Sequence, residues 1–208
     1  MRRIMSGAAG MTPPSPPNPS PPSRRRCGHG ADPVGCHGIH VPGHTACLAH
    51  LGDADRDAYL AGLIPGADID HSGTPFTEPL LDAVLDALRD PATGHPRLGV
   101  ARFEAATFQG YAGFDSATFE GAAGFELAAF QDDAGFRSAT FQGYAWFQSA
   151  TFEHDARFEQ AVFEHDAWFE QAVFERSVSL GPLVCAGRVK LSGTRGYSKT
   201  AWEKSTVA

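Results

Sequence analysis

Phenylalanine recurs along residues 101–174 at alternating spacings of five and six, and each Phe has Ala two positions before it. In an extended chain the Ala and Phe of such a triplet point to the same side, because successive side chains of a strand alternate between faces. An α-helix would scatter the Phe side chains, since a five-residue step turns it by about 140° and a six-residue step by about 240°. The pattern therefore predicts very short strands with one buried face. The Phe positions are Phe103, Phe108, Phe114, Phe119, Phe125, Phe130, Phe136, Phe141, Phe147, Phe152, Phe158, Phe163, Phe169 and Phe174.

Strands of three residues cannot form an independent sheet, but a coiled chain stacks each strand on its equivalent in the next coil. Two steps of five and two of six give a four-sided coil of twenty-two residues. Fourteen such sides make about three and a half coils, or about 17 Å at ~4.8 Å between strands. Gly and Asp residues between the triplets are expected at the corners. The predicted stacks include Phe103, Phe125, Phe147 and Phe169, and also Phe108, Phe130, Phe152 and Phe174.

Tandem Ala-x-Phe-x-x units resemble the repeats of pentapeptide-repeat proteins. The resemblance implies an all-β repeat fold, a right-handed four-sided β-helix, with the Phe and the Ala two places before it pointing inward. The usual family unit is five residues and its coil twenty, so two opposite corners of this chain must each hold an extra residue. A Cys/His segment and a helix before Phe-centred repeats also resemble one branch of this family. Some family members act on DNA gyrase by imitating DNA.

Composition divides the chain into four expected regions. Residues 1–26 are a Pro/Ser/Arg-rich tail with too little apolar sequence to form a packed core. Residues 27–100 form a Cys/His-rich helical module that caps the solenoid. Its first helix is expected from the N-cap Asp53 to about Gly62, and its second from Thr77 to Asp90, lying over the solenoid end. Residues 101–176 form the β-helix, and residues 177–208 form a degenerate last coil and a polar tail.

Cysteine and histidine gather before the repeats, and Cys27, Cys36, Cys47 and His50 provide a Cys₃His set that suits zinc. The short Cys47-x-x-His50 spacing is typical of structural zinc sites. His29 or His44 could replace His50 in this set. The alternative interpretation is a small core of free thiols with solvated histidines. Four protein ligands would leave no open position for catalysis, so a metal here is expected to be structural.

The repeat region is strongly acidic, because thirteen Asp and Glu against four Arg give residues 101–176 a formal charge of −9. An acidic rod repels nucleic acid, so direct nucleic-acid binding is not expected. Regular carboxylates could instead imitate the phosphates of DNA before a topoisomerase or another DNA-binding protein. Acidic faces are also an ordinary means of keeping a solenoid soluble.

Trp146 and Trp168 lie twenty-two residues apart and both occupy the outward middle position of a triplet. With Tyr144 they are expected to form an exposed aromatic column. Such a column is a candidate contact surface for a partner. The alternative interpretation is a cross-strand aromatic pair that stabilises the solenoid.

Catalytic motifs are absent from the sequence: there is no Ser-His-Asp order, nucleophile elbow, phosphate loop or dinucleotide fingerprint. Glu153-His154-Asp155 and Glu164-His165-Asp166 are half a coil apart, so they are expected on opposite sides, unable to share an ion. We therefore expect a protein that is not an enzyme.

No apolar stretch resembles a secretory signal or a membrane span, which predicts a cytoplasmic protein without membrane contact. The expected function is a protein-interaction scaffold with an unidentified protein partner. A DNA-mimicking regulator is the alternative. After Phe174 the repeat degenerates, so either residues 183–191 complete the last coil or the open end pairs with a second copy in a homodimer.

Overall fold

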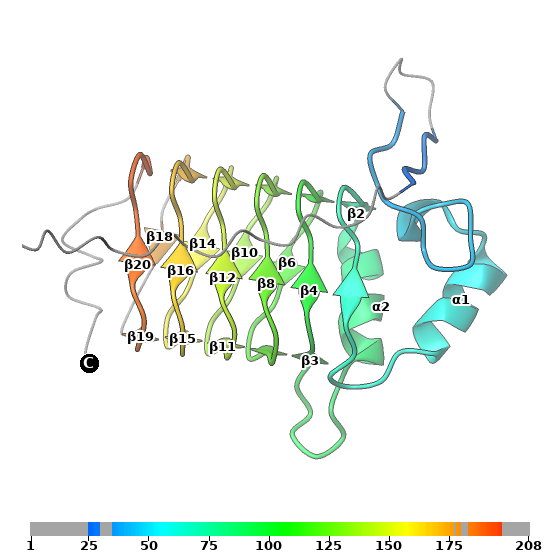
Figure 1. Cartoon of the computed structure of the whole chain (residues 1–208), viewed down its shortest axis with the longest axis horizontal. Coiled ribbons are helices and arrows are strands. Elements are labelled where there is room, and N and C mark those ends of the chain that lie inside the picture. Colours follow the sequence, from blue (N-terminus) through cyan, green and yellow to red (C-terminus); the bar gives the residue numbers. More distant parts are fainter. Residues whose placement is uncertain (1–24, 30–34, 177, 180–182, 197–208) are drawn as a thin grey trace, which may run out of the picture.

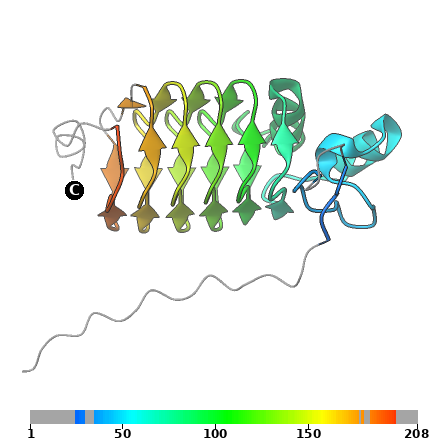
Figure 2. The ribbon, with the colours of Figure 1, turned by 90° about the horizontal axis from the view of Figure 1, so that it is seen from above.

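The computed structural model describes residues 25–29, 35–176, 178–179 and 183–196 (Figure 1). The expected tail, residues 1–26, falls almost entirely outside these described residues. The described chain forms a β-solenoid of stacked coils with a small helical module at its N-terminal end (Figures 1 and 2). All strand pairs within the solenoid are parallel, and four sheets make its four sides.

Each strand contains two residues, and each sheet runs along the solenoid axis. The six-stranded sheet consists of β1 (Ile69–Asp70), β4 (Ala101–Arg102), β8 (Ala123–Gly124), β12 (Ala145–Trp146), β16 (Ala167–Trp168) and β20 (Val189–Lys190). One five-stranded sheet consists of β2 (Pro75–Phe76), β5 (Thr107–Phe108), β9 (Ala129–Phe130), β13 (Thr151–Phe152) and β17 (Val173–Phe174). The other consists of β3 (Arg97–Leu98), β7 (Thr118–Phe119), β11 (Thr140–Phe141), β15 (Val162–Phe163) and β19 (Val184–Cys185). The four-stranded sheet consists of β6 (Ala112–Gly113), β10 (Ala134–Gly135), β14 (Ala156–Arg157) and β18 (Val178–Ser179).

The register confirms the twenty-two-residue coil, since Ala101 pairs with Ala123 and Phe130 with Phe152. Inside the coil the equivalent Phe rings stack almost parallel. The Phe103–Phe125 ring centroids are 5.3 Å apart and those of Phe130 and Phe152 are 4.6 Å apart. The repeat Phe side chains are 0–3% exposed, so they form a continuous core. The small Ala two residues before each ring leaves it room.

Pairing extends the solenoid before residue 101, where the sequence analysis placed its start. Ile69 pairs with Ala101, Pro75 with Thr107, and Arg97 with Thr118. Residues 69–98 of the expected cap are therefore a first, degenerate coil. With six strands in its longest sheet, the solenoid spans about 24 Å at ~4.8 Å per strand, rather than the expected 17 Å. At the other end, β19 and β20 continue the same register.

Helix α2 (Glu78–Ala87) replaces the fourth side of that first coil. It lies against β6, at the end of the four-stranded sheet (Figure 1). Leu81, Val84, Leu85 and Leu88 are buried, and Leu80 is partly buried against the same core, so the helix has one apolar face. The helix thus covers an end where core side chains would otherwise meet solvent.

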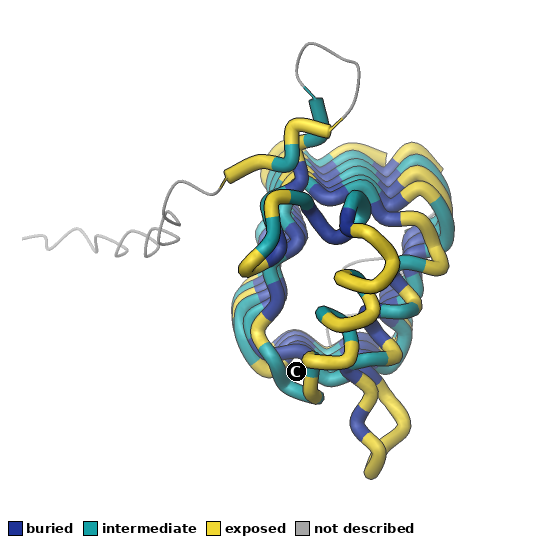
Figure 3. The backbone as a smooth tube through the Cα atoms, turned by 90° about the vertical axis from the view of Figure 1, so that its right-hand side faces the viewer, coloured by how far each residue is buried: buried dark blue, intermediate teal, exposed yellow. Residues whose placement is uncertain are grey.

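Two shorter helices complete the N-terminal module: the 3₁₀ helix η1 (Leu48–His50) and α1 (Asp53–Ala61). Asp53 is the first helical residue rather than the N-cap, which is Gly52, and no side chain caps this helix end. Figure 3, which looks onto this end of the solenoid, shows the module over the coil opening. A helix of nine residues is only marginally stable alone, so tertiary contacts must hold α1 in place. None of its residues is fully buried, and Tyr59 and Leu60 make partly buried contacts with the core.

The corners differ from the expectation. The seven non-glycine residues with positive φ, between 55° and 61°, all follow a repeat Phe by two positions. Gly121 and Gly143 lie at the other corners, where a Cβ on Gly143 would collide with the Gly121 carbonyl oxygen of the preceding coil. Glycine is therefore required there by close approach of two backbones, whereas non-glycine residues adopt the left-handed conformation. These residues are Ala105, Ser116, Leu127, Ser138, Ser149, Gln160 and Gln171.

Leu127→Gly is expected to raise the free energy of unfolding by about 0.5–1 kcal/mol, because Leu127 is 65% exposed and has a φ of 59°. Urea denaturation would measure the change. Ala129→Gly, two residues further on in β9, is the matched control and should destabilise by a similar amount. Destabilisation by both substitutions would contradict a strained corner at Leu127.

His71 closes the N-terminal end of the Phe103 stack. Its ring is 1% exposed and lies edge-on to Phe76, with ring centroids 5.8 Å apart. The Tyr59 hydroxyl of α1 lies 3.2 Å from His71 Nε2. Burial lowers the pKa of His71 to about 4 and raises that of Tyr59 to about 12. Both groups are therefore neutral at pH 7, and the hydrogen bond between them ties α1 to the first coil.

His71 alone is expected to lower the free energy of unfolding by about 3 kcal/mol between pH 6.5 and pH 4, whereas Glu126, whose pKa is raised to about 7, acts in the opposite direction over much of this range. In this range the unfolded chain binds a proton on His71 and the folded chain, with its lower pKa, does not. The contribution is complete above pH 6.5 and is lost as the pH falls toward 4. Denaturation at several pH values would test this. Over this range the free energy of unfolding should fall by about 3 kcal/mol more in wild type than in His71→Phe, and identical changes in the two proteins would contradict the assignment.

Candidate metal centre

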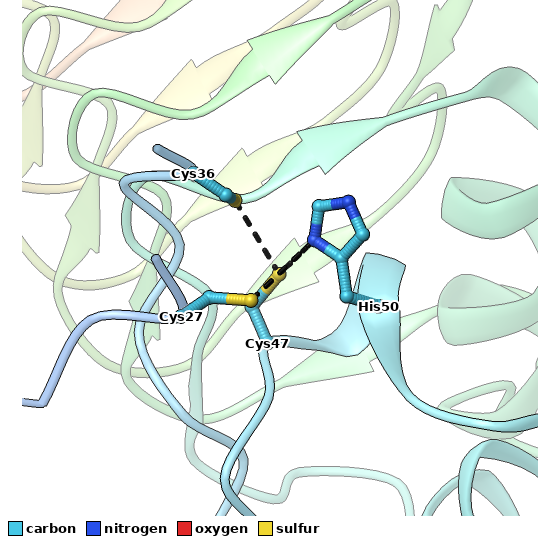
Figure 4. A group of neighbouring side chains, drawn as sticks. All are labelled: Cys27, Cys36, Cys47 and His50. Atoms are coloured by element: carbon cyan, nitrogen blue, oxygen red, sulfur yellow. Dashed lines mark hydrogen bonds between the residues drawn. The ribbon is translucent and has the colours of Figure 1, made fainter. Parts of the chain in front are cut away.

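Four side chains of the N-terminal module converge on one point, as Figure 4 shows. The Sγ atoms of Cys36 and Cys47 are 3.7 Å apart. The Nδ1 atom of His50 is 3.3 Å from Cys47 Sγ and 3.5 Å from Cys27 Sγ. All four atoms lie within 4.8 Å of one another. The structure thus brings together the Cys27, Cys36, Cys47 and His50 set that the sequence predicts.

These separations match the edges of a zinc tetrahedron. With Zn–S bonds of about 2.3 Å and a Zn–N bond of about 2.0–2.1 Å, tetrahedral geometry puts two sulfur atoms about 3.8 Å apart. It puts a sulfur and a nitrogen about 3.6 Å apart. Three protein distances, of 3.7, 3.5 and 3.3 Å, lie close to these values. The group could therefore hold a tetrahedral metal ion without a large rearrangement.

Local backbone structure positions each ligand. Two antiparallel segments carry Cys27 and Cys36: Cys27 N–H donates to the Gly38 carbonyl at 2.7 Å, and Gly28 N–H donates to the Cys36 carbonyl at 3.0 Å. Gly28 and Gly35 both have φ near +60°, which lets the chain turn tightly beside each Cys. Cys47 immediately precedes η1, and its single turn brings His50 onto the same side.

The alternatives to His50 lie elsewhere. His29 stacks on the His50 ring, with centroids 4.5 Å apart and 25° between planes, so it supports the ligand instead of replacing it. His44 pairs with Asp55 at 3.7 Å on the neighbouring helix. The Gly38 N–H donates to Cys36 Sγ at 3.3 Å. Contacts of this kind orient metal ligands and stabilise charge on sulfur.

Electrostatics favour a cation at this point. Burial, together with the neighbouring Cys36 and Cys27 side chains, raises the pKa of Cys47 to about 12. Burial, with His29 nearby, lowers the pKa of His50. His50 is therefore neutral at pH 7, which is the form that binds a metal. A divalent cation would offset the repulsion among three thiolates.

The cluster lies directly on the first coil of the solenoid. The Ile39 N–H donates to the Ser72 carbonyl at 3.0 Å. A Cβ placed on Gly38 would lie 2.6 Å from Cys47 Cβ and 3.2 Å from Thr74 Oγ1, and one placed on Gly73 would collide with the His37 carbonyl. Only glycine fits at these two positions. The ligand loops and the solenoid corner are therefore packed as one unit.

The expected aromatic surface is only partly exposed. Trp146 and Trp168 stack in one column as expected, with centroids 5.6 Å apart and 12° between planes. Trp168, however, is 6% exposed, so its expected exposure is wrong. Tyr144 is 38% exposed and its ring centroid is 5.2 Å from that of Trp168. Lys190 Nζ lies 5.2 Å from the Trp168 ring centroid, a contact that the sequence analysis missed.

A second group of metal-ligand type, Asp132, Asp133 and His154, was also missed. Asp132 and His154 are twenty-two residues apart, so the group joins equivalent corners of successive coils. The spacing between His154 and His165 does not reveal this contact. His154 follows β13 and His165 follows β15, which belong to different sheets, in agreement with their expected separation. Asp133 already binds Arg157 at 2.7 Å and accepts a hydrogen bond from the Asp155 N–H. This corner is therefore a surface ion-pair cluster.

Comparison with known proteins identifies the repeats. A family model described as pentapeptide repeats (9 copies) matches residues 114–162 and 136–181. Comparisons with curated proteins and with solved structures gave no significant match. Neither helix among the described residues is long and apolar enough to cross a membrane. With this repeat match and a four-sided parallel coil of inward Phe and Ala side chains, the solenoid is a pentapeptide-repeat β-helix, and residues 114–181 carry the repeats that the family model matches.

Proposed function

We propose that the protein is a non-enzymatic scaffold that binds another protein through its short acidic β-solenoid. The observation that carries this proposal is the rigid, repeated outer surface: corresponding outward side chains stack at a fixed spacing over a fully packed Phe core. Such a surface can present several contacts at once without ordering on binding, which lowers the entropic cost of association. The net charge of −9 over residues 101–176 favours partners with basic surfaces.

Zinc is the metal that we propose for the Cys27, Cys36, Cys47 and His50 group, because three thiolates and one imidazole suit it and the four atoms lie near tetrahedral positions. Its role would be structural. All four positions would be filled by protein ligands, so no position would remain for a substrate or an activated water. Bound zinc would hold the two ligand loops against the first coil and so keep the solenoid capped.

The test is affinity capture from native cytosol, which is also the compartment that we propose, at low and high salt. Specific retention of a protein that survives high salt would support the scaffold. Absence of any retained protein would contradict it. Light scattering of the purified protein would show whether the partner is instead a second copy, joined through a solenoid end.

A DNA-mimicking regulator is the second candidate, and the acidic charge is the observation that favours it. A solenoid of about 24 Å covers about fourteen phosphate spacings of 1.7 Å, more than the sequence alone predicts. Such a mimic would retain a topoisomerase or another DNA-binding protein and release it steeply with salt, because its contacts are charge pairs. Salt-resistant retention would contradict it. Neither candidate requires direct binding to nucleic acid.

A further inference from the structure

The outward column of the six-stranded sheet has one gap. Along the solenoid axis, Gly124 is followed by Trp146 and then Trp168, and these two rings stack on each other. Gly124 is the only position of this column, among the described strands, that carries no side chain. The column consists of Asp70, Arg102, Gly124, Trp146, Trp168 and Lys190.

The two ends of the tryptophan stack differ. Lys190 closes one end, with its Nζ atom 5.2 Å from the Trp168 ring centroid. A cation at this distance from an indole face is stabilised by the ring quadrupole. At the other end, the remaining face of Trp146 is turned toward the coil that contains Gly124. The stack therefore has a cation at one end and no side chain from its own column at the other.

Two carboxylates lean over the gap. A Cβ placed on Gly124 would lie 2.9 Å from Glu126 Oε2 and 3.1 Å from Glu104 Oε1. Glu126 Oε2 is screened from solvent and has no hydrogen-bond partner among the residues that the structure describes. A buried carboxylate oxygen without a donor is costly. Burial raises the pKa of Glu126 to about 7, opposed by a hydrogen bond from its own backbone N–H and by Arg102, and reinforced by Glu104.

Charge and size indicate which chemical group could bind between these carboxylates and Trp146. Asp70, Glu104 and Glu126 are three carboxyl groups around the single cation of Arg102, so the group attracts a further cation. Arg102 and Trp146 are two strand spacings apart in the column, about 9.6 Å. The carboxylates of Glu104 and Glu126 occupy part of this interval, so a planar group would enter it as they turn aside to bind it. A guanidinium is planar, stacks on an indole face and donates two parallel hydrogen bonds to a carboxylate, which an ammonium cannot do.

We propose that Glu104, Glu126 and the free face of Trp146 form a site above Gly124 that binds an arginine side chain of the partner protein. This proposal rests on the proposed scaffold function and names the chemistry of the partner. The arginine would repeat on Trp146 what Lys190 does on Trp168. Glu126, at the end of a flexible side chain, would turn its unpaired oxygen to the incoming guanidinium.

The first test titrates N-acetyl-arginine amide into the full-length ¹⁵N-labelled protein and follows the tryptophan indole N–H signals by NMR. Saturable shifts of the Trp146 signal are expected. N-acetyl-citrulline amide, a neutral isostere, should cause no shift. Absence of saturable binding by the arginine amide, or equal binding of both compounds, would overturn the proposal.

Matched variants separate this site from the general acidic field. Glu126→Gln removes one charge with little change of shape and should weaken arginine-amide binding about tenfold, which corresponds to about 1.4 kcal/mol. Glu170→Gln makes the same charge change two coils away in the same outward position and should alter affinity less than twofold. Equal weakening in both variants would reduce the interaction to nonspecific attraction and overturn the site.

Gly124→Lys supplies the cation from within the chain. The atoms nearest to a Cβ at this position are the flexible ends of Glu104 and Glu126, so the fold should persist, as circular dichroism would verify. Arginine-amide binding should then be lost, and binding retained by a folded Gly124→Lys protein would overturn the proposal. Cytosolic capture keeps the two proposals distinguishable. Partners held equally by wild type and Glu126→Gln would remove this site but keep the scaffold, whereas no partner for wild type would remove the scaffold.

Discussion

Cys47→Ser is expected to abolish stoichiometric zinc binding and to unfold the N-terminal module. Cys47 is fully buried and lies 3.7 Å from Cys36 Sγ and 3.3 Å from His50 Nδ1, so its loss removes the ligand closest to the others. Structural zinc contributes about 10–16 kcal/mol of apparent binding free energy in zinc-finger peptides, which exceeds the stability of most small domains. Even a fraction of this value would decide whether the ligand loops fold.

Metal content by mass spectrometry and hydrogen exchange along the chain would measure the effect. Wild type should copurify with one zinc, and a strong chelator should reproduce the Cys47→Ser loss of protection around α1 and the first coil. Cys185→Ser is the matched control, since Cys185 is buried at the far end of the solenoid and lies outside the ligand group. A wild-type protein without zinc, or full protection in Cys47→Ser, would contradict a metal-stabilised cap.

Phe136→Ala is expected to lower the free energy of unfolding by about 3–5 kcal/mol. Phe136 is fully buried between Phe114 and Phe158, with ring centroids 5.2 and 4.9 Å away. Neighbouring coils are held rigidly by their own ladders, so they cannot collapse into the cavity, and the cost should lie at the upper end of this range. Urea denaturation followed by circular dichroism would measure it.

A Phe at the end of a stack provides the control for Phe136→Ala. Phe174 is 3% exposed and stacks on Phe152 at 4.7 Å in the last turn of its column. Phe174→Ala should cost roughly half as much as Phe136→Ala, because the end of a solenoid can relax or fray locally. Equal costs for the two substitutions would mean that the solenoid does not behave as a stack of nearest-neighbour coils.

The repeat itself could be predicted from sequence because one strict spacing decides both the strand face and the register. The first coil could not. One of its triplets has Ile69 and His71 at the Ala and Phe positions, and another keeps Phe76 but has Thr74 at the Ala position. Helix α2 also interrupts the spacing of the triplets. Their equivalence becomes visible only through pairing with the next coil. The inserted helix was predicted, but not that it replaces a strand.

The metal ligands, too, could be predicted only in part from the sequence. Cysteine chemistry identified the candidate set, and the one-turn spacing of Cys47 and His50 identified a local pair. The choice of His50 over His29 depends on ring stacking between two separate loops, which no spacing reveals. Likewise, the burial of Trp168 depends on stacking across coils, with Lys190 near its ring. Contacts between separate loops or between coils, rather than spacing within one segment, decided these outcomes.

Because the register repeats every twenty-two residues, the length of the solenoid can change in steps of one coil. Removing residues 123–144 would join positions that are already equivalent, so both ends should be preserved while the solenoid shortens by one strand spacing, about 4.8 Å. Removing eleven residues would instead turn everything beyond the cut by half a coil and carry Trp146 to the opposite side. Gene-level gain or loss of whole coils can therefore alter reach without altering the orientation of either end, whereas half-coil changes alter orientation first.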